Sequence, residues 1–225
     1  MAGPDHMLFL LMLLLVAPCT TVDGRWVPSR SARSSTWRVI LIATSFAIGH
    51  SLTLALASLG WLSLPTGPVE VIIAVSVAIT AINALRPLFP RSEAWIAGGF
   101  GLAHGLAFAT LVGDLGLDHF STVLGFDLGI ELAQLAIVAL SMPSLYVLSL
   151  TRYYPALRIA GGTFGLLAAL GWIAERTIDG VSSPLEPLMA GLPKHGLMVA
   201  AVLALLAIAD AAAESLPSER TFSAS

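Results

Sequence analysis

The sequence predicts an all-α fold, a polytopic transmembrane helical bundle with about seven spans. Of the 225 residues, 56% are hydrophobic and only 11% are charged, whereas soluble domains carry about 25% charged residues. The apolar residues also gather into stretches close to the length of about 20 residues that crosses a bilayer. These stretches run over 4–22, 38–60, 68–86, 94–113, 120–148, 156–174 and 196–212.

The connections between these stretches are too short to fold separately, so we expect one transmembrane domain over residues 1–213. A polar tail follows at 214–225, and its composition favours disorder. The first stretch could be a signal peptide, but its leader carries Asp5 where a basic residue is usual, and Pro18 makes a poor cleavage site. We therefore interpret it as a retained span.

The basic residues predict the orientation, because cytoplasmic connections carry an excess of Lys and Arg. Nine of the 11 fall on one side of the expected spans. The N-terminus is then outside and the C-terminus cytoplasmic, in a multi-pass protein of the cell inner membrane. The nine are Arg25, Arg30, Arg33, Arg38, Arg86, Arg91, Arg152, Arg158 and Arg220, and the two on the outer side are Arg176 and Lys194.

The net charge and the cysteine content exclude some classes of partner and of metal site. The net charge of -3 argues against nucleic-acid binding, which needs a basic stripe. Cys19 is the single cysteine, so neither an intrachain disulfide nor a thiolate metal cluster can form. The lipid bilayer is the expected surrounding, and the sequence leaves a homo-oligomer open.

Ionisable side chains inside the spans are the candidate functional residues, because such groups are costly in a bilayer. At a rise of about 1.5 Å per residue, His50, His104 and Glu131 lie at similar depths, about 15 Å below the outer surface. Asp127 lies one turn from Glu131 on the same helix face. The full set is Asp5, His6, His50, Glu70, His104, Asp127 and Glu131.

Imidazole with carboxylate and no thiolate suits a divalent first-row metal such as nickel, cobalt or zinc. Glycines flank the candidate ligands and would let helix backbones approach closely. A single intramembrane histidine is more often an interhelical hydrogen-bonding group, and a carboxylate near a helix end can reach water, so the structural interpretation stays open. The glycines are Gly49, Gly101, Gly105, Gly125 and Gly129.

Five segments in order resemble the HupE/UreJ family of membrane proteins, in the branch that often carries an extracytoplasmic N-terminal domain. Together they cover most of residues 3–175. The segments are GPDHMLFLLMLLL (3–15), IGHSLTLALASLG (48–60), VEVIIAVSVAITAIN (69–83), GFGLAHGLAFA (99–109) and LGFDLGIELAQL (124–135).

The resemblance implies movement of nickel, or a related divalent metal, for hydrogenase and urease maturation. It carries metal-site roles onto all of the candidate ligands above except Asp127. Asp127 stands where the family usually has Asn, which adds a negative charge here.

We therefore expect a divalent-metal permease, with nickel or cobalt favoured and zinc as a further option. His50 and His104 would be central ligands, Asp127 and Glu131 would supply charge, and Asn83 would line the inner path. Asp5, His6 and Glu70 would form the outer entrance. Two other classes remain: an intramembrane metal-dependent hydrolase, suggested by Ser51 beside His50, and a metal-free accessory protein.

Overall fold

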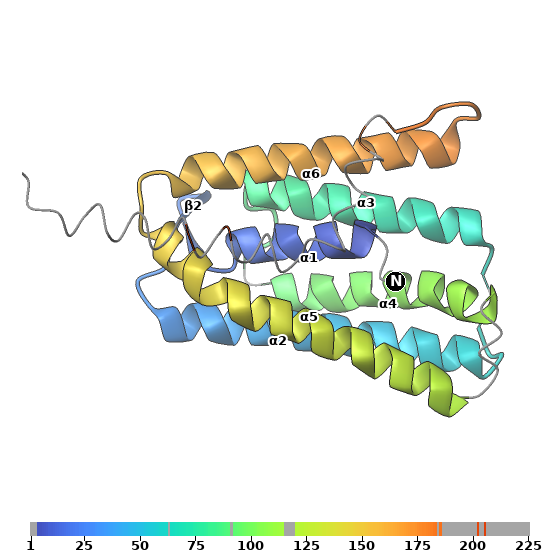
Figure 1. Ribbon diagram of the computed structural model, residues 1–225. Coiled ribbons are helices and arrows are strands. Elements are labelled where there is room, and N and C mark those ends of the chain that lie inside the picture. The colour runs from blue at the N-terminus through green and yellow to red at the C-terminus, as the bar shows by residue number, and fades with distance from the viewer. Residues whose placement is uncertain are drawn as a thin grey trace, which may run out of the picture.

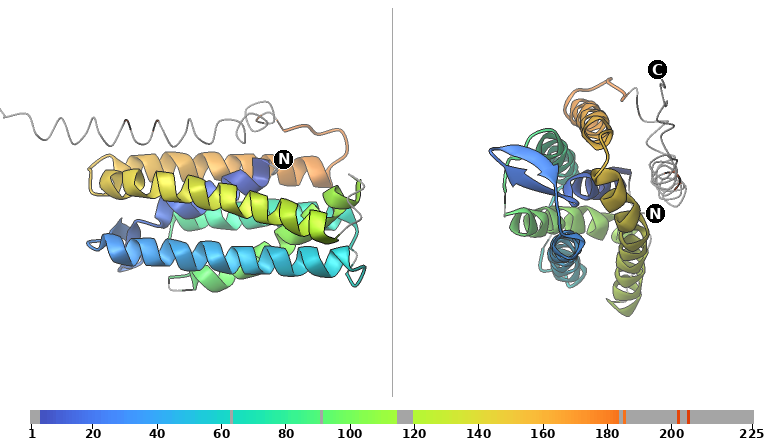
Figure 2. Two further views of the ribbon diagram at one scale, coloured as in Figure 1. Left: turned by 60° about the horizontal axis from the view of Figure 1, so that its bottom comes forward. Right: turned by 90° about the vertical axis from the view of Figure 1, so that its left-hand side faces the viewer.

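The computed structural model describes residues 4–62, 64–90, 92–114, 120–183, 185, 202 and 205. Within them, six helices lie side by side along one axis, and a two-stranded hairpin sits at one end (Figures 1 and 2). The elements are α1 (Pro4–Val16), β1 (Cys19–Val22), β2 (Arg25–Pro28), α2 (Ala32–Ser58), α3 (Thr66–Leu85), α4 (Glu93–Asp114), α5 (Phe120–Ser149) and α6 (Tyr154–Thr177).

Successive helices alternate in direction, as a membrane bundle with short connections requires (Figure 1). We call one end the hairpin end; it holds residues 17–31, 86–90, 92 and 150–153. The opposite end holds residues 59–62, 64–65 and 178–183. Helices α1, α3 and α5 run toward the hairpin end, and α2, α4 and α6 run away from it.

The protein is a multi-pass membrane protein. Four of the described helices are long and apolar enough to cross a membrane: α2, α3, α6 and the part of α5 from Asp127. Most of the seventh predicted span, 196–212, and the tail 214–225 lie outside the described residues; Val202 and Leu205 are helical. The count of seven spans and the orientation therefore remain predictions.

The first predicted span, 4–22, is wrong over its last six residues, because α1 ends at Val16. Pro18 explains the end: its ring removes a backbone donor and disfavours helix at the preceding residue. At 13 residues α1 is short, but it is apolar on all sides and buried among the other helices. Leu8, Phe9 and Met12 accordingly belong to the main core.

The segment that follows α1 is a β-hairpin rather than membrane helix. Val22 pairs with Arg25, so the turn is the dipeptide Asp23-Gly24, with φ values of 49° and 69°. Asp-Gly is the strongest short-range hairpin signal because both turn residues need positive φ. The strand before it, Cys19–Val22, contains three β-branched residues, which favour extended backbone.

The hairpin and α6 together cap the C-terminus of α3. Trp26 Nε1 donates to the carbonyl of Asn83 over 2.7 Å, and Arg158 donates to the carbonyls of Ala84 and Leu85. These are the carbonyls that the helix end leaves without a partner, and the cation also suits the negative end of the helix dipole.

The side chain of Asn83 takes part in this end structure. Its side-chain Oδ1 accepts from the amide of Leu88 over 2.9 Å, and the residue is buried. The side chain therefore fixes the turn after α3, and its place beside an inner path stays a prediction.

Helices α2 and α4 pack backbone to backbone at their glycines, as predicted for three of the five. A Cβ at Gly49 would stand 2.2 Å from the carbonyl oxygen of Gly98, and a Cβ at Gly101 or Gly105 would stand 2.2 Å from a carbonyl oxygen of α2. No side chain fits at those distances, so only glycine allows this approach. Gly125 and Gly129 differ, because a Cβ at either would meet nothing within 4 Å.

Candidate metal centre

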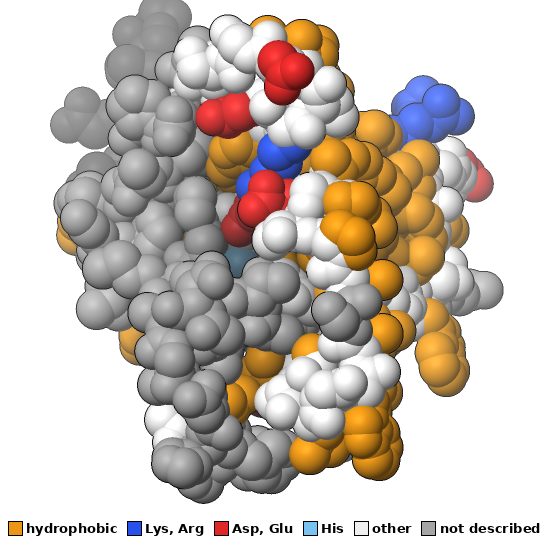
Figure 3. Space-filling view, turned by 90° about the vertical axis from the view of Figure 1, so that its right-hand side faces the viewer, with side chains coloured by type: hydrophobic (Ala, Val, Ile, Leu, Met, Phe, Trp, Pro, Cys, Tyr) orange, Lys and Arg blue, Asp and Glu red, His pale blue; other side chains and the backbone are white. Residues whose placement is uncertain are grey.

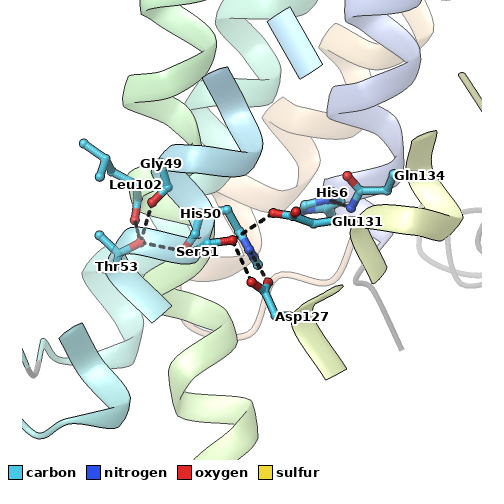
Figure 4. A network of polar contacts seen from close by, with 9 residues as sticks. All are labelled: His6, Gly49, His50, Ser51, Thr53, Leu102, Asp127, Glu131 and Gln134. Atoms are coloured by element: carbon cyan, nitrogen blue, oxygen red, sulfur yellow. Dashed lines mark hydrogen bonds and ion pairs between the residues drawn. The ribbon is translucent and has the colours of Figure 1, made fainter. Parts of the chain in front are cut away.

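Three predicted ligands from α2 and α5 converge inside the bundle. His50, Asp127 and Glu131 each offer one ligand atom, and these atoms lie within 4.8 Å of one another. His50 and Asp127 are buried, and Nδ1 of His50 lies 2.9 Å from Oδ1 of Asp127. His50 and Glu131 thus lie close together, and Figure 4 shows the group with its neighbours; that these residues bind a metal stays a prediction.

Ser51 lies between the two carboxylates of this group. Its hydroxyl Oγ is 2.7 Å from Oδ2 of Asp127 and 2.9 Å from Oε1 of Glu131. A hydroxyl has a single proton to donate, so it cannot satisfy both carboxylates at once. Among the ion pairs of the described residues, neither carboxylate is joined to Lys or Arg. A divalent cation would supply the missing positive charge.

The other two histidines form a ring cluster beside the group. The ring centroid of His6 lies 5.7 Å from that of His50 and 5.3 Å from that of His104, and Phe46 packs against all three imidazoles. The side-chain amide of Gln134 contacts Nε2 of His6. Three helices thus bring imidazoles together in the interior.

His104 lies in this cluster but outside the compact group of ligand atoms. Its Nε2 is 3.0 Å from the hydroxyl of Ser76 on α3. The structure therefore places His104 beside the candidate centre, although it was predicted to be a central ligand.

A cavity of about 30 Å³ opens between α1, α2 and α5 at this level. His6, Glu131 and Gln134 line it where it meets the site, and apolar side chains such as Phe46 and Val138 line the rest. This volume holds one or two water molecules, which is also the scale of a partly dehydrated metal ion. The cavity beside the ligand group is therefore small.

Asp5 and Glu70 lie apart from the ligand group and share one arginine. Nη2 of Arg176 is 3.2 Å from Oδ2 of Asp5, and its Nε is 3.6 Å from Oε2 of Glu70. Nη1 also donates to the backbone carbonyl of Glu70 over 2.9 Å. Asp5 and Glu70, which were predicted to form an entrance, thus lie together near the end opposite the hairpin. The guanidinium of Arg176 lies between them.

A comparison with protein-family models identifies the chain. The model of the family described as HupE / UreJ protein matches residues 1–176. The chain belongs to the HupE/UreJ family. No curated protein and no solved structure matches it.

HupE/UreJ membership indicates a membrane protein connected with nickel or cobalt. The donor set agrees with such a metal, because imidazole nitrogen and carboxylate oxygen suit borderline divalent ions. His50 sits on α2 and the two carboxylates sit one turn apart on α5, so a metal there would join these two helices.

Three contributors to the site in this HupE/UreJ protein were not assigned from sequence: Ser51 as a bridge, Ser76 as the partner of His104, and Arg176 as the partner of Asp5 and Glu70. Hydroxyl residues are common in membrane helices, so Ser76 gave no signal, and Ser51 stood out only through its position next to His50. Arg176 did carry one. An arginine on the side that is otherwise poor in basic residues indicates a nearby carboxylate.

Proposed function

We propose that this HupE/UreJ protein is a permease for a divalent first-row metal, with nickel favoured, cobalt next and zinc as a further option. His50, Asp127 and Glu131 bind the ion within the membrane. His6 and His104 stand beside that position and would receive or release the ion. The protein lies in the inner membrane with its N-terminus outside and its C-terminus in the cytoplasm.

One observation supports this proposal above the others: the ligand atoms of a buried histidine and two carboxylates lie within 4.8 Å of one another, with too few donors for the charge of the carboxylates. Unpaired buried charge is costly, so such a group persists where a cation or proton compensates it. A structural role would instead favour a carboxylate paired with arginine, as Asp5 is.

The test is metal binding and uptake by the purified full chain. Calorimetry would measure nickel binding, and proteoliposomes loaded with a metal-sensitive dye would measure entry. We expect Glu131→Gln to lower nickel affinity at least tenfold and to stop uptake, because the amide keeps the shape but loses the charge. Asp127→Asn should be milder, since its single amide oxygen can still accept a hydrogen bond from either His50 or Ser51.

A matched control is Asp23→Asn, which removes a carboxylate from the exposed hairpin turn and should change neither binding nor uptake. Thermal unfolding of each variant separates loss of site from loss of fold. Full uptake by a well-folded Glu131→Gln protein would remove Glu131 from the site. Lipid hydrolysis by the metal-loaded chain, without metal entry, would favour the intramembrane hydrolase.

A further inference from the structure

Arg176 closes the opposite end of the bundle with a three-helix ion-pair cluster. Its guanidinium, on the last turn of α6, joins Asp5 of α1 and Glu70 of α3. The side chains are partly accessible, at 20% for Arg176, 18% for Asp5 and 46% for Glu70. The Trp172 ring lies under the guanidinium, with 5.9 Å from its carbon to the ring centroid. We call these three charged residues the Arg176 clasp.

The clasp lies directly above the imidazole cluster. Asp5 precedes His6 in the chain, and its Oδ1 accepts from the His6 amide over 2.9 Å. The His6 ring in turn packs against His50 and His104. Seen from this end, acidic and basic side chains border a hollow in which a histidine is visible (Figure 3). An ion that enters from this end therefore meets the clasp before it meets the imidazoles.

We propose that Arg176 gates this entrance and favours divalent ions, an inference that rests on the proposed metal permease. Its guanidinium occupies the two carboxylates until an arriving dication replaces it. The Coulomb attraction of a dication for each carboxylate is twice that of a monovalent ion at equal distance. A monovalent ion gains no charge advantage over the arginine it must displace, so it is held out.

Arg176 could also act only as a structural tie that holds α6 to α1 and α3, here called a strap. A gate and a strap predict different transport kinetics. In a gate, arginine competes with metal, so its removal lowers the half-saturating metal concentration and leaves the maximal rate unchanged. In a strap, its removal loosens the bundle, so stability and maximal rate fall together while the half-saturating concentration does not improve.

The experiment measures initial nickel influx into proteoliposomes over a range of nickel concentrations, with thermal unfolding of each variant. Arg176→Gln removes the charge, and Arg176→Lys keeps the charge but loses the forked geometry that reaches both carboxylates. Arg152→Gln is the matched control, because Arg152 is an exposed arginine at the hairpin end. Glu131→Gln tests whether the nickel influx depends on the proposed metal site.

We expect the half-saturating nickel concentration to fall about two- to fivefold in Arg176→Gln, the range set by a partly exposed ion pair. The half-saturating nickel concentration of Arg176→Lys should lie between those of Arg176→Gln and the wild type. If Arg176→Gln does not fold, Arg176→Lys alone tests the gate. Addition of potassium should inhibit influx more in Arg176→Gln than in the wild type. Arg152→Gln should match the wild type.

The gate is overturned if a folded Arg176→Gln or Arg176→Lys protein has an unchanged or higher half-saturating nickel concentration. The conditions for this conclusion are that the wild type transports nickel and that Glu131→Gln does not. That result would leave the permease intact. Absence of influx in the wild type would overturn both proposals.

Discussion

Asp127 is the side chain through which α2 and α5 are held at the candidate centre, because it contacts both His50 and Ser51. Glu131, one turn further along α5, meets only the hydroxyl among these contacts. The two carboxylates therefore have different surroundings although they share a helix face. A metal would draw on both, but Asp127 also orients the imidazole, which is a common arrangement around metal-ligating histidine.

The sequence could predict which residues lie at one depth, because rise along a helix is fixed. It could not predict how each helix is rotated about its axis, which depends on packing. His50 and Glu131 met as expected. His104 has the same depth but is turned toward Ser76 of α3, and no feature of its own helix distinguishes these two directions.

At the residue scale, this difference gives a testable separation of the two histidines. We expect His50→Gln to lower nickel affinity at least tenfold, since it removes a nitrogen from the compact group. His104→Gln should change nickel affinity less than threefold. The amide of Gln can still hydrogen-bond to Ser76, and Nε2 of His104 lies outside the group of ligand atoms. Isothermal titration calorimetry of both proteins measures this directly. Equal losses in the two variants would return His104 to the ligand set.

Among the elements, α3 to α6 follow the predicted boundaries to within three residues, α2 begins six residues before the predicted 38–60, and the first helix ends early. Long apolar runs bounded by Pro, Gly and Arg leave little freedom for α2 to α6. The run 4–22 contains its own interruption at Pro18, followed by β-branched residues and Asp23-Gly24. Those signals outweigh hydropathy, because a turn that needs positive φ at two positions selects the hairpin.

The contact of α2 with α4 predicts opposite outcomes for glycines of the same bundle. Gly49→Ala forces a methyl group against the Gly98 carbonyl at 2.2 Å, and overpacking of this kind destabilises by about 1–3 kcal/mol. Gly125→Ala adds a methyl group in open space, so it should be neutral or slightly stabilising through helix propensity. Thermal unfolding in one detergent compares them. A Gly49→Ala protein as stable as Gly125→Ala would show that α2 and α4 do not approach this closely.

The hairpin predicts the reactivity of the single cysteine. Burial raises the pKa of the Cys19 thiol to about 11 from 9.0, so at pH 8 its thiolate fraction is about 100-fold smaller than that of an ordinary thiol. Maleimide should label native protein slowly, and the rate should rise with pH toward 11. Trp26→Ala removes the hydrogen bond to Asn83 and should speed labelling at pH 8.

The control for this experiment is Trp95→Ala, which removes an exposed tryptophan near the same end and leaves the hairpin contacts intact. Its labelling rate should equal that of the wild type. If native Cys19 were labelled as fast as a free thiol, or if Trp26→Ala changed nothing, the hairpin would not be packed against α3.

For the whole molecule, the exposed side chains describe a membrane band. Trp37 and Trp61 are 61% and 77% exposed and stand near the two ends of α2, with exposed Ile48 and Leu52 between them. The helix from Trp37 to Ser58 spans about 32 Å at 1.5 Å per residue, close to the hydrocarbon core of about 30 Å. Tryptophan at both borders is typical of membrane proteins.

The arginines are divided between the two ends of this band. Those at positions 25, 30, 33, 38, 86, 152 and 158 lie at or near the hairpin end, and Arg176 lies at the other, where carboxylates compensate it. The positive-inside rule then predicts that the hairpin end faces the cytoplasm. The fold shows which residues share an end; which end faces the cytoplasm is a separate prediction.

Single-cysteine labelling tests that orientation in a Cys19→Ser background. Ser34→Cys places a thiol at the exposed start of α2, near the hairpin end, and Val181→Cys places one in the exposed connection after α6. In right-side-out vesicles, a membrane-impermeant maleimide should label Val181→Cys at once and Ser34→Cys only after permeabilisation, because the arginine-rich end is retained in the cytoplasm. The two variants are each other's control for thiol reactivity. The reverse labelling pattern would show that the protein has the opposite orientation in the membrane. The Arg176 clasp would then face the cytoplasm and could not gate entry from outside.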